Sequence, residues 1–78
     1  MTDYAGEVAG LIARQLGQHE VGQRDRLIED LGASSLDLVT IIAVLEESYG
    51  VRVDEERLPL LRTVADVASE LGRLRGGG

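Results

Sequence analysis

Two adjacent serines, Ser34 and Ser35, are the side chains of this sequence best placed for chemistry. Asp37 follows Ser34 by three residues, a spacing at which a serine hydroxyl caps a helix and an acid reaches back to the cap. With Ser34 as the cap, Ser35 takes the first helical position and its hydroxyl stays free. Unpaired N–H groups and the helix dipole favour an anion there, which suits a phosphodiester on Ser35. An ordinary polar residue at a helix start has the same pattern, so spacing alone leaves both interpretations open.

Catalysis by Ser35 itself finds no support in the rest of the chain. The single histidine, His19, lies in a polar stretch, and the chain contains neither a G-x-S-x-G elbow nor a cluster of metal ligands. The absence of cysteine excludes disulfides and thiolate metal sites. We therefore expect neither enzyme activity nor a bound metal.

Helical periodicity predicts the elements that must position the serines. Apolar residues recur at helical spacing over about residues 3–16, 34–49 and 64–74, and a short helical turn is expected over 54–61. Thr63 and Asp66 form a second capping-box pattern, Asp54 is the expected cap of the short turn, and Pro59 limits the length of that turn. The expected fold is all-α, a small four-helix bundle of three main helices and one short helix.

A long loop separates the first two helices of this predicted bundle. Connections of this length rarely lack packed residues in small domains. We therefore expect four apolar residues to anchor the loop across the bundle, namely Val21, Leu27, Ile28 and Leu31. Residues 1–78 are expected to form a single domain in a monomer, with 76–78 as a flexible glycine tail.

The helix expected over residues 34–49 has two apolar strips. If Leu38 is placed at zero on a wheel of about 100° per residue, a core stripe falls within about 60° of it, formed by Ile41, Ile42, Leu45 and Tyr49. The second strip lies about 100–160° away, begins next to Ser35, and consists of Leu36, Val39 and Ala43. Either the helix is central and packed on both sides, or the second strip, which acids flank, is a transient docking surface.

The negative charge is concentrated in the middle of the chain. The net charge is −6, and nine of the fourteen acidic residues but only two of the eight arginines lie within residues 25–56. This distribution disfavours nucleic-acid binding, because a phosphate backbone attracts the opposite charge. A solvated surface and a surface that steers basic protein partners both remain open.

Neither a membrane span nor a targeting segment is expected. No apolar run approaches the roughly 18 residues of a transmembrane helix. Residues 1–7 contain two acids and no base, unlike a signal or transit peptide. We expect a cytoplasmic protein.

Residues 29–37, Glu-Asp-Leu-Gly-Ala-Ser-Ser-Leu-Asp, resemble the phosphopantetheine attachment motif of acyl carrier proteins, E-D-L-G-A-D-S-L-D in its usual form. The similarity continues through 45–49, 53–56 and 63–66, and covers about residues 4–74. It implies that a phosphopantetheinyl transferase uses coenzyme A to attach 4'-phosphopantetheine to Ser35. The thiol of this arm then carries an acyl group as a thioester between enzymes of fatty-acid, polyketide or related natural-product biosynthesis.

The resemblance also implies a docking face for partner enzymes. The expected partners are the transferase and an acyl-loading enzyme, ketosynthase or acyltransferase with basic docking patches. The implied docking residues are Leu36, Asp37, Val39, Ala43, Glu46, Glu47, Asp54, Glu55 and Glu56. Some members of the family shelter the acyl chain between helices, for which the candidate lining is Val39, Leu45, Val53, Leu58 and Leu61.

Two departures from the family pattern leave alternatives open. Ser34 stands where the family usually has aspartate, and Thr40 stands where it often has an acid. An aminoacyl or peptidyl carrier and an unmodified docking module therefore remain alternatives, although G-A-S-S-L-D is more typical of acyl carriers. Residues 73–77 also resemble the tail of ubiquitin-like proteins, but the helical period of the chain disfavours their β-grasp fold.

Overall fold

The computed structural model describes residues 4–76 and confirms the expected helical bundle. Its elements are α1 (Tyr4–Leu16), α2 (Ser35–Tyr49), the 3₁₀ helix η1 (Glu55–Leu60) and α3 (Val64–Arg75). The expected first helical residue, Asp3, and the glycines at 77 and 78 lie outside the described residues. Gly76 is the C-cap of α3, and its N–H donates to the Gly72 carbonyl at 2.7 Å.

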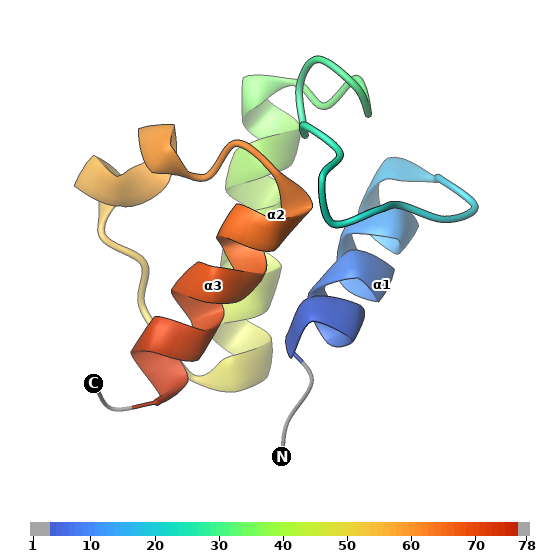
Figure 1. Ribbon diagram of the computed structural model, residues 1–78. Helices are drawn as coiled ribbons and strands as arrows, with labels where there is room; N and C mark the ends of the chain where they lie inside the picture. Colours follow the sequence, from blue (N-terminus) through green and yellow to red (C-terminus); the bar gives the residue numbers. More distant parts are fainter. Residues whose placement is uncertain (1–3, 77–78) are drawn as a thin grey trace.

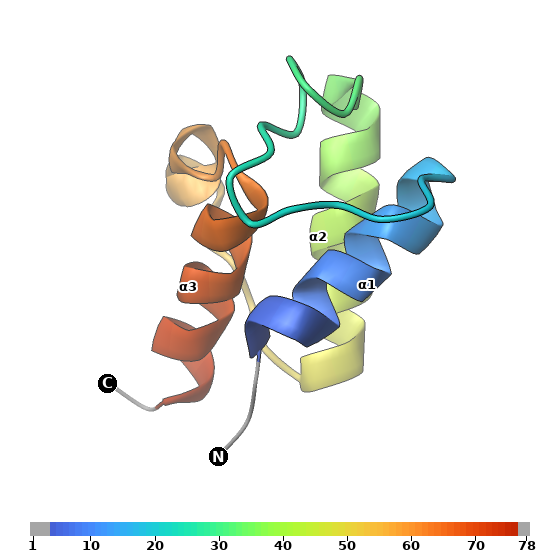
Figure 2. The same ribbon diagram turned by 45° about the vertical axis from the view of Figure 1, so that its right-hand side comes forward.

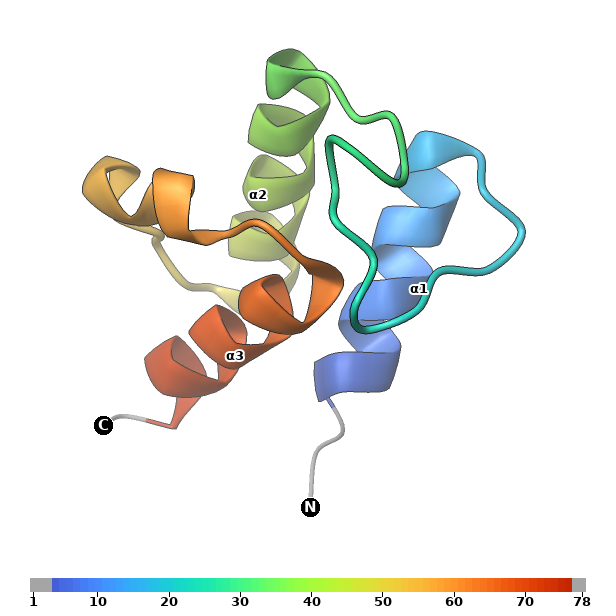
Figure 3. The ribbon, with the colours of Figure 1, turned by 45° about the horizontal axis from the view of Figure 1, so that its top comes forward.

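The three long helices pack side by side, with α1 running opposite to α2 and α3 (Figure 1). As a result, α1 begins and α3 ends at one end of the bundle, whereas α2 begins at the other end, as the turned view also shows (Figure 2). The short helix η1 lies beside α2 and α3, on the side away from α1 (Figure 3). No helix within residues 4–76 is long and apolar enough to cross a membrane.

The core is an aliphatic cluster to which all three long helices contribute. Ile12 of α1, Ile41 of α2 and Val64 of α3 are completely buried. The predicted core stripe of α2 is confirmed, since its buried residues are Ile41, Ile42 and Leu45, with Leu38 and Tyr49 half-buried. Burying apolar surface stabilises a fold by about 25 cal/mol per Å². Because the chain has no disulfides, this cluster is the main source of its stability.

The long loop over residues 17–33 is fixed to the start of α3 by backbone hydrogen bonds. The Leu27 N–H donates to the Arg62 carbonyl at 2.8 Å, and the Val64 N–H donates to the Asp25 carbonyl at 3.1 Å. Of the predicted apolar anchors, Val21 and Leu27 are buried and Leu31 packs against the core.

The prediction that Ile28 also anchors the loop is wrong, because its side chain is 51% exposed. Residues 27–31 form a tight turn in which the Asp30 and Leu31 N–H groups both donate to the Arg26 carbonyl. Successive side chains of a tight turn point in different directions, so Leu27 enters the core and Ile28 faces solvent.

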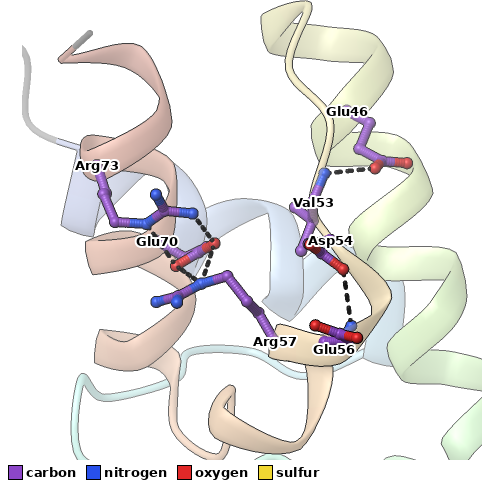
Figure 4. Close-up of polar contacts among 7 residues, drawn as sticks. All are labelled: Glu46, Val53, Asp54, Glu56, Arg57, Glu70 and Arg73. Carbon is purple, nitrogen blue, oxygen red and sulfur yellow. Dashed lines mark hydrogen bonds and ion pairs between the residues drawn. The ribbon is translucent and has the colours of Figure 1, made fainter. Parts of the chain in front are cut away.

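One buried acid, Glu70, ties η1 to α3. The Glu70 carboxylate accepts hydrogen bonds from Arg73 Nη2 at 2.7 Å and from Arg57 Nε at 2.8 Å (Figure 4). The bond from Arg73, with that from Arg57, outweighs the effect of burial and lowers the pKa of Glu70 to about 2. The spacing of Glu70 and Arg73 is visible in the sequence, but only the fold brings Arg57 to the same carboxylate.

We expect the Glu70 cluster to make the protein less stable in acid. Because the folded-state pKa of about 2 lies below the ordinary value of 4.5, the stabilisation is complete above pH 4.5 and is lost as the pH falls towards 2. The arginines are about half exposed, so the contribution is reduced by solvent to about 1–3 kcal/mol. Urea unfolding of the wild type and Glu70→Gln over this range should show a stability difference that shrinks with acidity. A difference independent of pH would contradict the assignment.

Candidate functional site

The capping box predicted at the start of α2 is present in full. Ser34 Oγ accepts a hydrogen bond from the Asp37 N–H at 3.0 Å, and Asp37 Oδ2 accepts one from the Ser34 N–H at 2.9 Å. Ser34 has an extended backbone, with φ −85° and ψ 171°, as a cap residue requires. Ser34 is therefore committed to the cap, and Ser35 is the first residue of the helix.

Ser35 is exposed, and its hydroxyl has no hydrogen-bond partner among residues 4–76. The N–H groups of Ser35 and Leu36 are likewise without acceptors in this part of the chain. Free donors at the positive end of a helix stabilise a phosphate group, so the start of α2 fits a phosphodiester on the Ser35 oxygen. His19 is exposed in the loop and has no hydrogen bond to either serine within residues 4–76.

The second apolar strip of α2 points away from the core. Leu36 is 74% exposed, Val39 is 54% exposed, and Ala43 is also exposed. Thr40 lies on the same exposed side, where its hydroxyl donates to the Leu36 carbonyl at 3.1 Å. The alternative of a central helix packed on both sides is therefore wrong, and the strip forms an apolar surface that begins next to Ser35.

Three of the six predicted docking acids already bind backbone N–H groups. Besides Asp37 in the capping box, Glu46 Oε2 accepts from the Val53 N–H at 2.7 Å and Asp54 Oδ1 accepts from the Glu56 N–H at 3.0 Å (Figure 4). The other three docking acids, Glu47, Glu55 and Glu56, have no side-chain partner among residues 4–76.

These six acids take no part in the ion pairs formed within residues 4–76. The ion pairs in this part of the chain join Arg26 to Glu29 and Asp30, and Arg57 and Arg73 to Glu70. None of them involves a predicted docking acid. The exposed side of α2 and η1 therefore combines apolar contacts with unpaired negative charge.

A surface groove of about 770 Å³ runs between α2 and η1. Its apolar lining is Val39, Ile42, Ala43, Val53 and Leu58, and its charged lining is Glu46, Arg52, Asp54 and Glu55. Three of the five candidate lining residues, Val39, Val53 and Leu58, therefore border the groove. The other two, Leu45 and Leu61, border a separate inner cavity of only about 10 Å³.

Two residues of the groove, Ile42 and Arg52, are not among those that the sequence pattern predicts for it. Ile42 was assigned to the core stripe, and it serves both roles because its side chain lies where the stripe meets the groove. Arg52 sits outside every periodic segment, and only the path of the chain after α2 brings it to the groove.

Comparison with known proteins identifies similar sequences over most of the chain. A family model for the phosphopantetheine attachment site matches residues 6–71. The acyl carrier protein of Thermotoga maritima is 38% identical over 72 residues, which cover 90% of this chain and 89% of that protein.

Two solved structures share the fold. The crystal structure of an acyl carrier protein from Thermotoga maritima matches with a TM-score of 0.78 at 18% identity, over 92% of this chain and 86% of that chain. A chain of the structure described as the ishigamide ketosynthase/chain length factor matches with a TM-score of 0.77 at 24% identity, over 97% of this chain and 99% of that chain.

Proposed function

This chain belongs to the family of acyl carrier proteins that bear phosphopantetheine, and from that premise we propose that Ser35 is the attachment residue. The chain is a carrier and not an enzyme. The observation that carries the proposal is the difference between the two serines at the start of α2. Ser34 is bonded as the cap, whereas the neighbouring Ser35 is exposed and its hydroxyl has no partner in the described residues.

Attachment requires a phosphopantetheinyl transferase with coenzyme A. The Ser35 oxygen forms a bond to the phosphorus that carries pantetheine, the bond from that phosphorus to the nucleotide side of coenzyme A breaks, and the nucleotide leaves. The hydroxyl proton passes to a base of the transferase. The product phosphate would be held by the N–H groups of Ser35 and Leu36, which have no other acceptor in the described residues.

Once attached, the arm supplies a thiol that bears the acyl group as a thioester. The chain has no cysteine, so no side-chain thiol competes with it. The polypeptide contributes the attachment point and a surface on which partner enzymes recognise it.

The exposed face of α2 and η1 is the proposed docking surface for partner enzymes. Leu36 and Val39 give apolar contact close to Ser35, and the unpaired carboxylates of Glu47, Glu55 and Glu56 are available to arginine or lysine side chains of a transferase, ketosynthase or acyltransferase. Charges at the edge of such an interface mainly raise the association rate and select the partner. A cytoplasmic location and a monomeric state remain predictions.

Intact-mass measurement tests the attachment directly. We expect the protein, incubated with coenzyme A, magnesium and a broad-specificity phosphopantetheinyl transferase, to gain the mass of one phosphopantetheine. Fragmentation should place the added mass on residue 35 and not on residue 34. No gain with this enzyme, nor with transferases from the same source as the protein, would contradict the proposal and leave the α2 surface as a docking face alone.

A further inference from the structure

The groove and the inner cavity share two lining residues, and we call these two side chains the wall. We call the 770 Å³ groove the outer groove and the 10 Å³ space the inner cavity. Ile42 and Val53 border both spaces. Ile42 is held within the long helix α2, whereas Val53 lies in the non-helical segment between α2 and η1. Val53 is therefore the part of the wall that can be displaced without unfolding a long helix.

Glu46 of α2 accepts two hydrogen bonds from this segment, whose Val51 and Val53 side chains also pack against the core. Its carbonyl accepts from the Val51 N–H at 3.2 Å, and its carboxylate accepts from the Val53 N–H at 2.7 Å. The second bond is short and involves a charged, half-buried acceptor, which places it among the stronger kinds of hydrogen bond. The far side of the segment is anchored separately, because Arg57 of η1 binds Glu70 of α3 (Figure 4).

The inner cavity as it stands is too small for an acyl chain. Its volume of about 10 Å³ is no more than one water-sized probe needs. Its lining is almost wholly apolar and includes Val67 and Leu71, deep between α2 and α3. Displacement of Val53 would join this lining to the outer groove.

We propose that Glu46 is a positioning residue that limits how deeply an acyl chain enters the bundle. By holding the Val53 N–H, it keeps the Val53 side chain as a wall, so that a short linear acyl group contacts the outer groove only. Loss of this hydrogen bond lets Val53 withdraw, and the acyl chain then reaches Val67 and Leu71. The inference rests on the proposed function in one respect, that the acyl group is borne on Ser35.

The hydrogen bond can be tested on the unmodified protein by amide hydrogen exchange. Glu46→Ala removes the acceptor and is expected to speed exchange at the Val53 N–H by at least about tenfold. Glu46→Gln removes the charge but keeps an oxygen acceptor, so it should speed exchange less than Glu46→Ala does. Glu47→Ala is the matched control, since Glu47 is the next residue and its carboxylate is free. Equal Val53 exchange in the Glu46→Ala and Glu47→Ala variants would overturn the proposal.

The depth of entry is tested with an octanoyl group loaded on the arm and read by methyl NMR. In the wild type, the change from acetyl to octanoyl should shift the methyl signals of Val39 and Leu58, which border only the outer groove. In Glu46→Ala the shifts should extend to Val67 and Leu71, which border only the inner cavity. Shifts confined to Val39 and Leu58 in this variant would overturn the proposal.

A second variant covers the case in which Glu46→Ala does not fold. Val53→Ala shortens the wall and keeps the backbone hydrogen bond, so it should give the inner shifts while the residue-53 N–H stays protected from exchange. If the shifts in Val53→Ala are confined to Val39 and Leu58, the Val53 side chain is not what keeps the acyl chain out of the inner cavity, and the proposal is overturned. A wild-type chain that takes no phosphopantetheine contradicts the proposed function instead, and the exchange comparison, which needs no arm, then decides whether Glu46 holds Val53.

Discussion

Ser35→Ala is expected to abolish phosphopantetheine attachment, whereas Ser34→Ala is expected to leave it intact. Of these two serines, Ser35 has the hydroxyl without a partner in residues 4–76, because the Ser34 oxygen accepts the Asp37 N–H at 3.0 Å. The effects on stability should be reversed. Loss of the Ser34 cap costs about 1 kcal/mol, whereas Ser35 is exposed and unbonded, so its replacement should change the free energy of unfolding by no more than about 0.5 kcal/mol.

Intact mass measures attachment in the two variants, and urea unfolding measures their free energies of unfolding. Each variant serves as the control for the other, because the two serines are neighbours at the start of the same helix. Attachment to Ser35→Ala, or its absence in a folded Ser34→Ala protein, would show that the roles of the two serines are assigned incorrectly.

Ile41→Ala is expected to be among the most destabilising single substitutions in α2, and Val39→Ala among the least. Ile41 is completely buried whereas Val39 is 54% exposed. Truncation of a buried isoleucine costs about 2–5 kcal/mol, a large part of the roughly 5–15 kcal/mol that stabilises a typical domain. Truncation at the exposed position should cost no more than about 0.5 kcal/mol. Both changes replace a β-branched residue by alanine within one helix, so the difference in helix propensity largely cancels.

Urea unfolding followed by circular dichroism gives both values under the same conditions. The comparison separates the two apolar strips of α2, the buried strip of the core and the exposed strip proposed as a docking surface. Similar costs at the two positions would mean that the Val39 strip is packed in solution, and the proposed docking surface would then be lost.

The helices and their caps were predictable because they depend on short-range patterns. The capping boxes of Ser34 with Asp37 and of Thr63 with Asp66 each lie within four residues of sequence, and both are present in the structure. The core stripe of α2 follows from helical spacing alone. The free Ser35 hydroxyl follows in turn, since only one of two adjacent serines can cap the helix.

The features that were not predicted depend on the path of the chain between helices. Periodicity does not say which residue of a tight turn faces inward, and this is why Ile28 was assigned wrongly to the core side of its loop. The pairing of Glu46 with the Val53 N–H, and of Arg57 with Glu70, joins residues of different elements. Helical spacing marked Glu46 only as a surface acid, and the structure shows that it also fixes a backbone segment.

The placement of the helix ends has a practical consequence for tethering. The first described residues of α1 and the last of α3 meet at one end of the bundle, and Ser35 begins α2 at the other (Figure 1). A linker, an affinity tag or a solid support joined through either end would therefore be held away from the proposed attachment residue. An arm on Ser35 would then extend from the opposite end of the bundle, so immobilised protein should still present a thioester to enzymes.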